Sequence, residues 1–259
     1  MNAKKPTKLG RGTDTLDRGA WNQFLDDVAS ARKSLGNPKT IWYRGHTNAA
    51  WRLTPSLLRD PRLASKERFL FAEYSRYSTR LIGQKRNEWE LLFDMQHYGI
   101  PTRLLDWSES LGVAVAFTVL QRYGEVSDSA LYVLDPIRLN EKSGIEGIKR
   151  VDDDLAFSYR EVYWNHRPFA PEYPIAIDPP FQNERMYAQR GTFTVHGRNT
   201  EPLEIQRSKE VRRVVLPQAA LRGASEFLEH GGFNEFSIYP DLFGMARHLG
   251  RLVRADWAS

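Results

Sequence analysis

The chain has 259 residues, 41% of them hydrophobic, which is enough for one large domain or two small ones with a sizeable core. It contains no cysteine, which excludes disulfides, cysteine zinc sites and thiol nucleophiles. The formal charge is +5, but Lys4, Lys5, Lys8 and Arg11 supply four of these charges in a segment without acids. The rest of the chain is nearly balanced, and we expect residues 1–14 to form a disordered basic tail.

The sequence contains no apolar run near the roughly 18 residues that span a bilayer, and its basic start lacks the apolar core of a signal peptide. We therefore expect a cytoplasmic protein that does not enter a membrane. No internal repeat or linker divides the chain, which favours one domain over residues 15–259. Gly-rich phosphate loops, Gly-x-Ser-x-Gly turns and helical His pairs are also missing, so the familiar hydrolase and nucleoside-triphosphate chemistries have no support.

The first half of the chain alternates helical and extended patterns. A helix is predicted from Asp14 or Thr15 to about 35, followed by a strand at 40–43 that ends in Arg44-Gly45-His46. Further helices are predicted at 63–86, with an apolar stripe facing the core, and at 87–95. The run 113–117 predicts that a helix at 111–123, capped by Ser108, is buried nearly all round.

The second half predicts more strands. They lie at 130–134, 191–196 and 211–216, and helices are expected at 181–190, 217–229 and from about 240. The acids at 152–154 are interpreted as a solvated helix start. The fold class is therefore α+β: a single domain with a small mixed or antiparallel sheet flanked by several helices.

The stretch from residue 96 to 107 concentrates polar and ring-bearing side chains around helix breakers. Gly99 is expected to end the preceding helix in the left-handed conformation, and Pro101 prevents its continuation. We expect a rigid helix-to-helix turn at the N-terminal end of the 111–123 helix, where backbone donors favour an anion. It would present the candidate ligand-binding residues His97, Tyr98, Arg103 and Trp107, together with Asp106. The alternative is a structural turn in which Arg103 and Asp106 pair with each other.

Two other segments carry arginines of the same kind. Arg44 at a strand end can bind an anion with its guanidinium fork, or can form a structural salt bridge. The 181–190 helix brings Glu184, Arg185 and Gln189 within two turns of one another. Three fixed arginines among aromatic rings suit a phosphorylated, ring-bearing ligand. No metal is expected, because isolated His residues on turns rarely form metal sites.

Four blocks of the sequence resemble the FRG domain family, which takes its name from a Phe-Arg-Gly signature. They are Trp-Tyr-Arg-Gly-His at 42–46, Trp-Arg-Leu-Thr-Pro-Ser-Leu-Leu-Arg at 51–59, the stretch 96–108, and Arg-Met-Tyr-Ala-Gln-Arg-Gly-Thr-Phe at 185–193. The blocks follow the order of the family, and the domain would cover about residues 20–255. Tyr43 replaces the signature Phe and conserves the ring.

The resemblance implies a role similar to those of bacterial anti-phage and toxin-like systems. The motif at 43–45 is similar to the first motif of arginine-type ADP-ribosyltransferases, which implies an ADP-ribosyltransferase-like fold and NAD as ligand. By this analogy Arg44 would hold the phosphates, Tyr43 or Tyr98 would contact the ring, and Glu184 or Gln189 would hold the ribose. Asp106 would be a further catalytic carboxylate, and His46, His97, Arg103, Trp107 and Arg185 would bind ligand.

Three hypotheses on function remain open. The first is an enzyme that binds a nucleotide such as NAD and transfers ADP-ribose to a macromolecular acceptor or cleaves NAD. The second is a non-catalytic sensor of a nucleotide or phage component. The third is nucleic-acid binding through the basic tail and exposed rings, which would depend steeply on salt.

Overall fold

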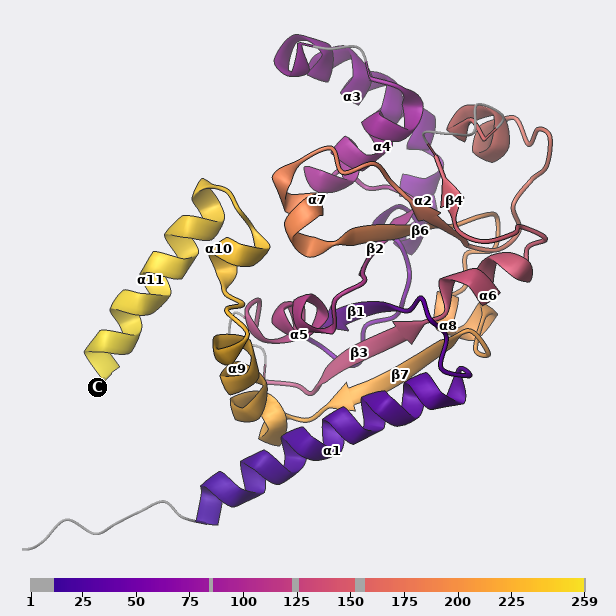
Figure 1. The fold of residues 1–259 in the computed structure, drawn as a ribbon. Coiled ribbons are helices and arrows are strands. Elements are labelled where there is room, and N and C mark those ends of the chain that lie inside the picture. The colour runs from indigo at the N-terminus through magenta and orange to yellow at the C-terminus, as the bar shows by residue number, and fades with distance from the viewer. Residues whose placement is uncertain (1–11, 84–85, 123–125, 152–156, 259) are drawn as a thin grey trace, which may run out of the picture.

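The computed structural model describes residues 12–83, 86–122, 126–151 and 157–258. A seven-stranded sheet lies at its centre, with helices around it (Figure 1). The strands are β1 (Trp42–His46), β2 (Leu104–Ser108), β3 (Ser129–Leu134), β4 (Lys149–Arg150), β5 (Ile175–Asp178), β6 (Gly191–Val195) and β7 (Val211–Leu216). The longer helices are α1 (Gly12–Ser34), α3 (Glu67–Ile82), α4 (Glu88–His97), α5 (Leu111–Val119), α9 (Leu221–His230) and α11 (Leu242–Ala258). The short ones are α2 (Pro61–Ala64), α6 (Pro136–Glu141), α7 (Glu184–Gln189), α8 (Leu203–Gln206), α10 (Glu235–Ile238), the 3-10 segments η1 (Ser56–Arg59) and η3 (Gln218–Ala220), and the π-helical η2 (Arg160–Trp164).

The strand order is β4-β5-β6-β2-β1-β3-β7. Neighbouring strands are antiparallel except β4 and β5, which are parallel. This arrangement confirms the predicted α+β class with a mixed sheet.

The sheet splits in its middle, between β1 and β2. β1 pairs with β3 along its whole length, and β2 does the same with β6. Between themselves β1 and β2 pair only where Tyr43 faces Ser108. Beyond this pair the two halves of the sheet separate, with β2 and β6 on one side and β1, β3 and β7 on the other (Figure 1). Backbone groups that would otherwise form a ladder therefore face an opening.

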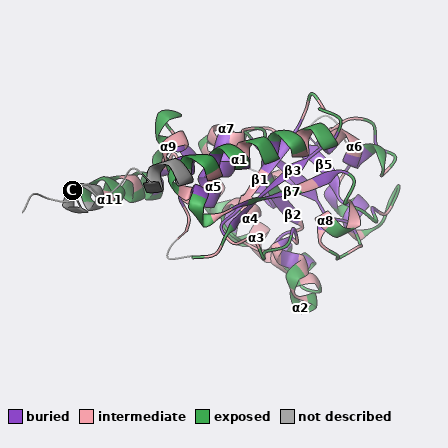
Figure 2. Cartoon of the chain, turned by 90° about the horizontal axis from the view of Figure 1, so that it is seen from below, coloured by how far each residue is buried: buried purple, intermediate pink, exposed green. Residues whose placement is uncertain are grey.

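Helices α1, α5 and α9 cover one face of the β1-β3-β7 half, and the buried residues gather in the strands (Figures 1 and 2). α5 is buried on nearly all sides, as predicted, although it ends at Val119. Its side chains pack with Tyr43 of β1, whereas Trp42 points into a separate cluster on the opposite face of the sheet. This alternation places Arg44 and His46 on the face away from α5.

Gly45 allows α5 to lie directly against β1. A Cβ atom at this position would lie 2.0 Å from the carbonyl oxygen of Ala114 and 2.8 Å from Cγ2 of Thr118. The obstacle is backbone and cannot rotate away. We expect Gly45→Ala to lower the free energy of unfolding in urea by about 1–3 kcal/mol. The matched control is Gly19→Ala in α1, where a Cβ would meet nothing within 4 Å. That variant is expected to gain up to about 1 kcal/mol, and equal effects of the two substitutions would contradict the packing argument.

Several sequence predictions are corrected by the fold. The stretch predicted as a turn at 103–107 lies mostly in strand β2, which covers Leu104–Ser108, because β6 supplies its backbone partners. The cap of α5 is Ser110, while Ser108 ends β2. The helix predicted at 63–86 is two helices, α2 and α3, and α3 ends at left-handed Gly83. Part of its predicted core stripe, including Tyr77 and Leu81, is exposed.

Other elements were missed or lie outside the described residues. The weak patterns at 136–141, 149–150 and 175–178 gave no prediction of α6, β4 and β5. The acidic run at 152–154 and residues 1–11 of the predicted tail lie outside the described residues. α1 begins at Gly12, ahead of the predicted caps.

Helix α11 projects from the body beside α10 (Figure 1). It contacts α10 through polar side chains, since Arg251 pairs with the buried Glu235 and Nδ1 of His248 lies 3.9 Å from Oε2 of the same carboxylate. Leu249 and Leu252 are exposed. Within the part of the chain that the structure describes, no helix combines the length and apolar character of a membrane span.

Candidate functional site

A cleft of about 760 Å³ opens where β1 and β2 separate. Its volume lies in the range of small-molecule sites. The walls come from β1, the segment 50–59, the end of α4, β2, α7, the start of β6 and Tyr239. Among the predicted site residues, the lining includes Tyr43, Arg44, His46, His97, Asp106, Trp107, Arg185 and Gln189.

Arg44 bridges the two strands at the split. Its Nη1 donates to the backbone oxygen of Asp106 at 2.5 Å and lies 3.3 Å from Oδ2 of the same residue. Its Nε donates to Nε2 of His46 at 3.0 Å. The guanidinium thus replaces a ladder hydrogen bond across the split, which fixes its position before any ligand arrives.

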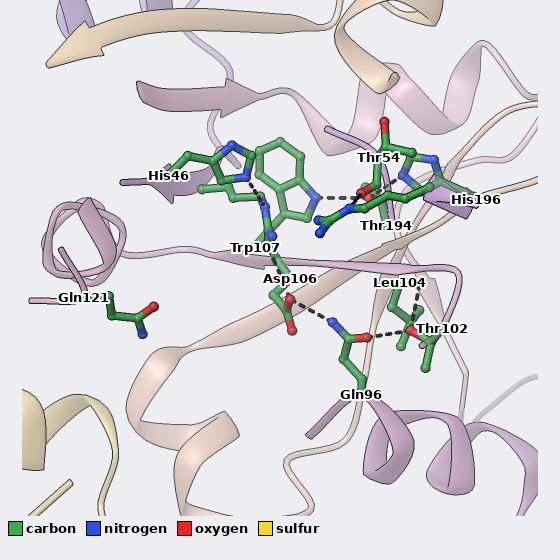
Figure 3. A network of polar contacts seen from close by, with 12 residues as sticks. His46, Thr54, Gln96, Thr102, Leu104, Asp106, Trp107, Gln121, Thr194 and His196 are labelled. Carbon is green, nitrogen blue, oxygen red and sulfur yellow. Dashed lines mark hydrogen bonds and ion pairs between the residues drawn. The ribbon is translucent and has the colours of Figure 1, made fainter. Parts of the chain in front are cut away.

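A line of hydrogen bonds holds Asp106 from the other side (Figure 3). The Leu104 N–H donates to Oγ1 of Thr102 at 3.1 Å, and this hydroxyl donates to Oε1 of Gln96 at 2.5 Å. The Gln96 amide then donates to Oδ2 of Asp106 at 2.8 Å. In this line each side chain that accepts a hydrogen bond donates the next one, so Gln96 of α4 and Arg44 of β1 orient the carboxylate from two sides. Oδ1 of Asp106 has no hydrogen-bond partner among the described residues.

His46 is a buried, neutral member of this site. Burial, and secondly the charge of Arg44, lower its pKa to about 3. Because Arg44 can only donate, Nε2 of His46 must accept, which assigns the imidazole proton to Nδ1. The imidazole therefore orients Arg44 and adds no charge near neutral pH.

The lining is strongly cationic. It contains Arg44, Arg52, Arg59 and Arg185, and Asp106 is the one acid among the described residues that form it. Arg52 lies 3.6 Å from Glu204, but its side chain is largely exposed. Burial, and secondly the charge of Arg44, lower the pKa of Arg59. Such an excess of guanidinium groups in a concave site favours an anionic ligand.

A second part of the lining comes from α7 and the segment before α11. The Arg185 guanidinium lies 4.6 Å from the ring centre of Tyr239. Gln189 donates its amide to the Ile238 oxygen at 3.1 Å. Burial, and secondly the charge of Arg185, lower the pKa of His97.

Arg103 does not belong to the cleft, which corrects the prediction that three arginine motifs share one cavity. Its guanidinium forms a two-point pair with Glu67, with distances of 2.6 and 2.7 Å. Tyr159 donates its hydroxyl to the same carboxylate. The alternative that Arg103 pairs with Asp106 is also wrong, because Asp106 pairs with Arg44. Arg103 lines a separate cavity of about 290 Å³.

Two more predicted site residues lie outside the lining. Tyr98 caps α4 with its ring exposed, and Glu184 is an exposed residue in the first turn of α7. Neither side chain is part of the cleft lining. Trp107 is buried and donates its indole N–H to Thr194 at 3.1 Å. Tyr43 packs against α5, so its ring belongs to the core.

Sequence reasoning missed four lining residues that are well placed to contact a ligand. They are Trp51, Arg59, Gln96 and Tyr239. Trp51 and Arg59 are the first and last residues of the block 51–59. An aromatic ring and a cation in one block could have indicated a binding site for a phosphorylated, ring-bearing ligand.

The residues around the split also match a known family. Residues 39–125 match the family model described as the FRG domain. The chain contains an FRG domain. No curated protein and no solved structure matches the chain. The matched range of the FRG domain includes Arg44, Trp51, Arg59 and Asp106, whereas α7 lies outside it. Its predicted extension over residues 15–259 stays a prediction.

The two buried histidines near the split predict acid sensitivity. Burial, with lesser effects from nearby arginines, lowers the pKa of both His46 and His196 to about 3. Between about pH 6.5 and 3 the unfolded chain binds protons at these sites that the folded chain does not, so stability falls as pH falls through this window. We expect urea unfolding between pH 7.5 and 4.5 to show this loss. His46→Gln and His196→Gln should each reduce the slope, and slopes equal to that of the unmodified protein would contradict the assignment.

Proposed function

We propose that the cleft binds a phosphorylated nucleotide, with NAD as the first candidate. The observation that carries this proposal is the cationic lining, in which four arginines accompany one carboxylate in a cavity that also contains aromatic rings. Arg44 would bind the phosphates, since its guanidinium is already fixed by Asp106 and His46. The similarity of the motif at 43–45 to arginine-type ADP-ribosyltransferases adds NAD to the candidate nucleotides.

The same residues suggest a reaction. Cleavage of NAD breaks the bond between the nicotinamide nitrogen and the ribose carbon, and nicotinamide leaves with the bonding electrons. Water or an acceptor group then bonds to that carbon and loses a proton. Asp106, with its Oδ1 unpaired among the described residues, would stabilise the positive charge that develops on the ribose. Gln189 would contact the ribose through Oε1, since its amide nitrogen is already bound to Ile238.

A non-catalytic nucleotide sensor is the second candidate. Asp106 already accepts hydrogen bonds from Arg44 and Gln96, an arrangement that also suits a carboxylate whose role is to hold an arginine. In this case the cleft would bind the ligand without turnover.

Titration calorimetry with NAD, followed by chromatography for nicotinamide, tests both candidates. Saturable binding with nicotinamide release supports the enzyme, and binding without release, with water or any added acceptor, supports the sensor. Absence of NAD binding would overturn the proposal.

If the protein is an enzyme that consumes NAD, we propose that it acts in a bacterial defence or toxin-like system. This role predicts that expression lowers cellular NAD only when Arg44 is intact.

A further inference from the structure

The segment 51–59 is a rigid part of the cleft wall. Leu53 and Leu57 are fully buried. The Leu57 N–H donates to the Thr102 oxygen at 3.2 Å, and the Leu203 N–H donates to the Leu53 oxygen at 3.0 Å. With these anchors in the core, the side chains of Trp51 and Arg59 are left on the cleft side.

Arg59 has the features of a phosphate ligand. Its Nε donates to the Thr54 oxygen at 3.0 Å, which holds the guanidinium in place. No acidic side chain among the described residues pairs with it. Arg44 lines the same cleft, and burial, with secondly the charge of Arg44, lowers the pKa of Arg59. Two guanidiniums that approach each other without a shared carboxylate repel, and an anion between them would relieve the repulsion.

Trp51 offers a ring surface beside these charges. Its side chain is about half exposed, at 53%, although the hydroxyl of Tyr132 fixes its backbone oxygen at 3.0 Å. Its ring centre lies 6.1 Å from that of His46, whose Nε2 accepts from Arg44. Indole, imidazole and guanidinium therefore form one continuous wall. An exposed indole on a fixed backbone is suited to stack on a nucleobase.

We infer that Arg59 and Arg44 together bind one phosphate group, and that Trp51 stacks on the base of the same nucleoside phosphate. This inference rests on the proposed function. It specifies which part of the nucleotide contacts this wall of the cleft, namely one phosphate and the base. Arg185, stacked on Tyr239, belongs to a different part of the lining. A nucleoside monophosphate is therefore sufficient for binding here.

Calorimetric titrations with adenosine 5′-monophosphate, ribose 5-phosphate, adenosine and NAD test the inference on the full chain. Arg59→Gln is expected to weaken the monophosphate and ribose 5-phosphate by about 10-fold or more, with little effect on adenosine. Trp51→Leu should weaken the monophosphate and adenosine by about 5-fold or more, while sparing ribose 5-phosphate. The matched control is Arg198→Gln, an exposed arginine on the smaller cavity, which should change nothing. Thermal melts of all variants establish that they are folded.

The outcomes separate this inference from the function on which it rests. If NAD binds but Arg59→Gln and Trp51→Leu keep full affinity for the monophosphate, the inference is overturned and the proposed function stands. If the monophosphate binds through Arg59 and Trp51 while NAD does not, the inference stands and NAD is excluded as the ligand. If none of the four probes binds to the unmodified protein, both are overturned.

Discussion

Arg44→Ala is expected to lower the affinity of the cleft for NAD by about 30-fold or more, which corresponds to about 2 kcal/mol or more. The substitution removes the phosphate ligand of the proposed function and also the bridge between β1 and β2. Asp106 would lose its ion pair, and His46 would lose the donor to Nε2. Titration calorimetry with NAD measures the loss directly.

Arg44→Lys separates charge from geometry in the same experiment. Lysine keeps the positive charge but cannot donate to His46 and Asp106 at once with a planar fork. We expect an affinity between those of the unmodified protein and Arg44→Ala. Affinity for NAD in Arg44→Ala equal to that in Arg198→Ala would show that Arg44 serves the fold and not the ligand.

Glu67→Ala is expected to destabilise the fold by about 3–5 kcal/mol, because it leaves the Arg103 guanidinium buried without its partner. The Arg103 and Glu67 side chains are only 15% and 9% exposed. Burial acts to lower the pKa of Arg103, and the hydrogen bonds and charge of Glu67, which raise it, are lost in this variant. A guanidinium nevertheless keeps its proton in proteins, so the buried charge stays without a partner. Tyr159 would also lose the acceptor of its hydroxyl. Urea unfolding at pH 7 measures the change.

The double variant Glu67→Leu with Arg103→Met supplies the control. Replacing both charges by apolar groups of similar size removes the buried unpaired charge, so a large part of the lost stability should return, while the Tyr159 hydroxyl still lacks its acceptor. Affinity for NAD should match that of the unmodified protein, because neither residue lines the cleft. A loss of affinity in this folded variant would restore Arg103 as a ligand-binding residue.

Local features of the fold were predictable because their causes lie within a few residues. Asn87 caps α4 in a capping box with Glu90, and Gly99 takes the left-handed conformation just after that helix. Gly45 lies at the end of the predicted strand, where the missing Cβ allows α5 to approach the backbone of β1. The apolar run in α5 predicted its burial, since a helix without a polar face must be covered. These signals depend on backbone sterics and on periodicity, which a sequence displays directly.

The site was predictable in its residue types but not in all its partners. Arg44 and Asp106, 62 residues apart, meet because β1 and β2 are neighbours. Arg103 pairs with Glu67, 36 residues away, because the fold places the first residue of α3 beside the residue that precedes β2. Ion pairs over such separations depend on how the elements pack. From the sequence alone, any of several acidic residues could have been the partner of either arginine.

The stretch from 96 to 107 has some features that its own sequence determines and others that depend on the tertiary structure. By itself the sequence determined that α4 ends near His97 and that a stiff, polar segment follows, and its blocks identified the FRG domain. Only the tertiary structure decided that this segment becomes strand β2, because β6 supplies the hydrogen bonds that a strand needs. The split beside β1 then directs Asp106 into the cleft, while Arg103, just before β2, pairs with Glu67. Side-chain direction in a strand depends on register, and register depends on partners that lie far away in the chain.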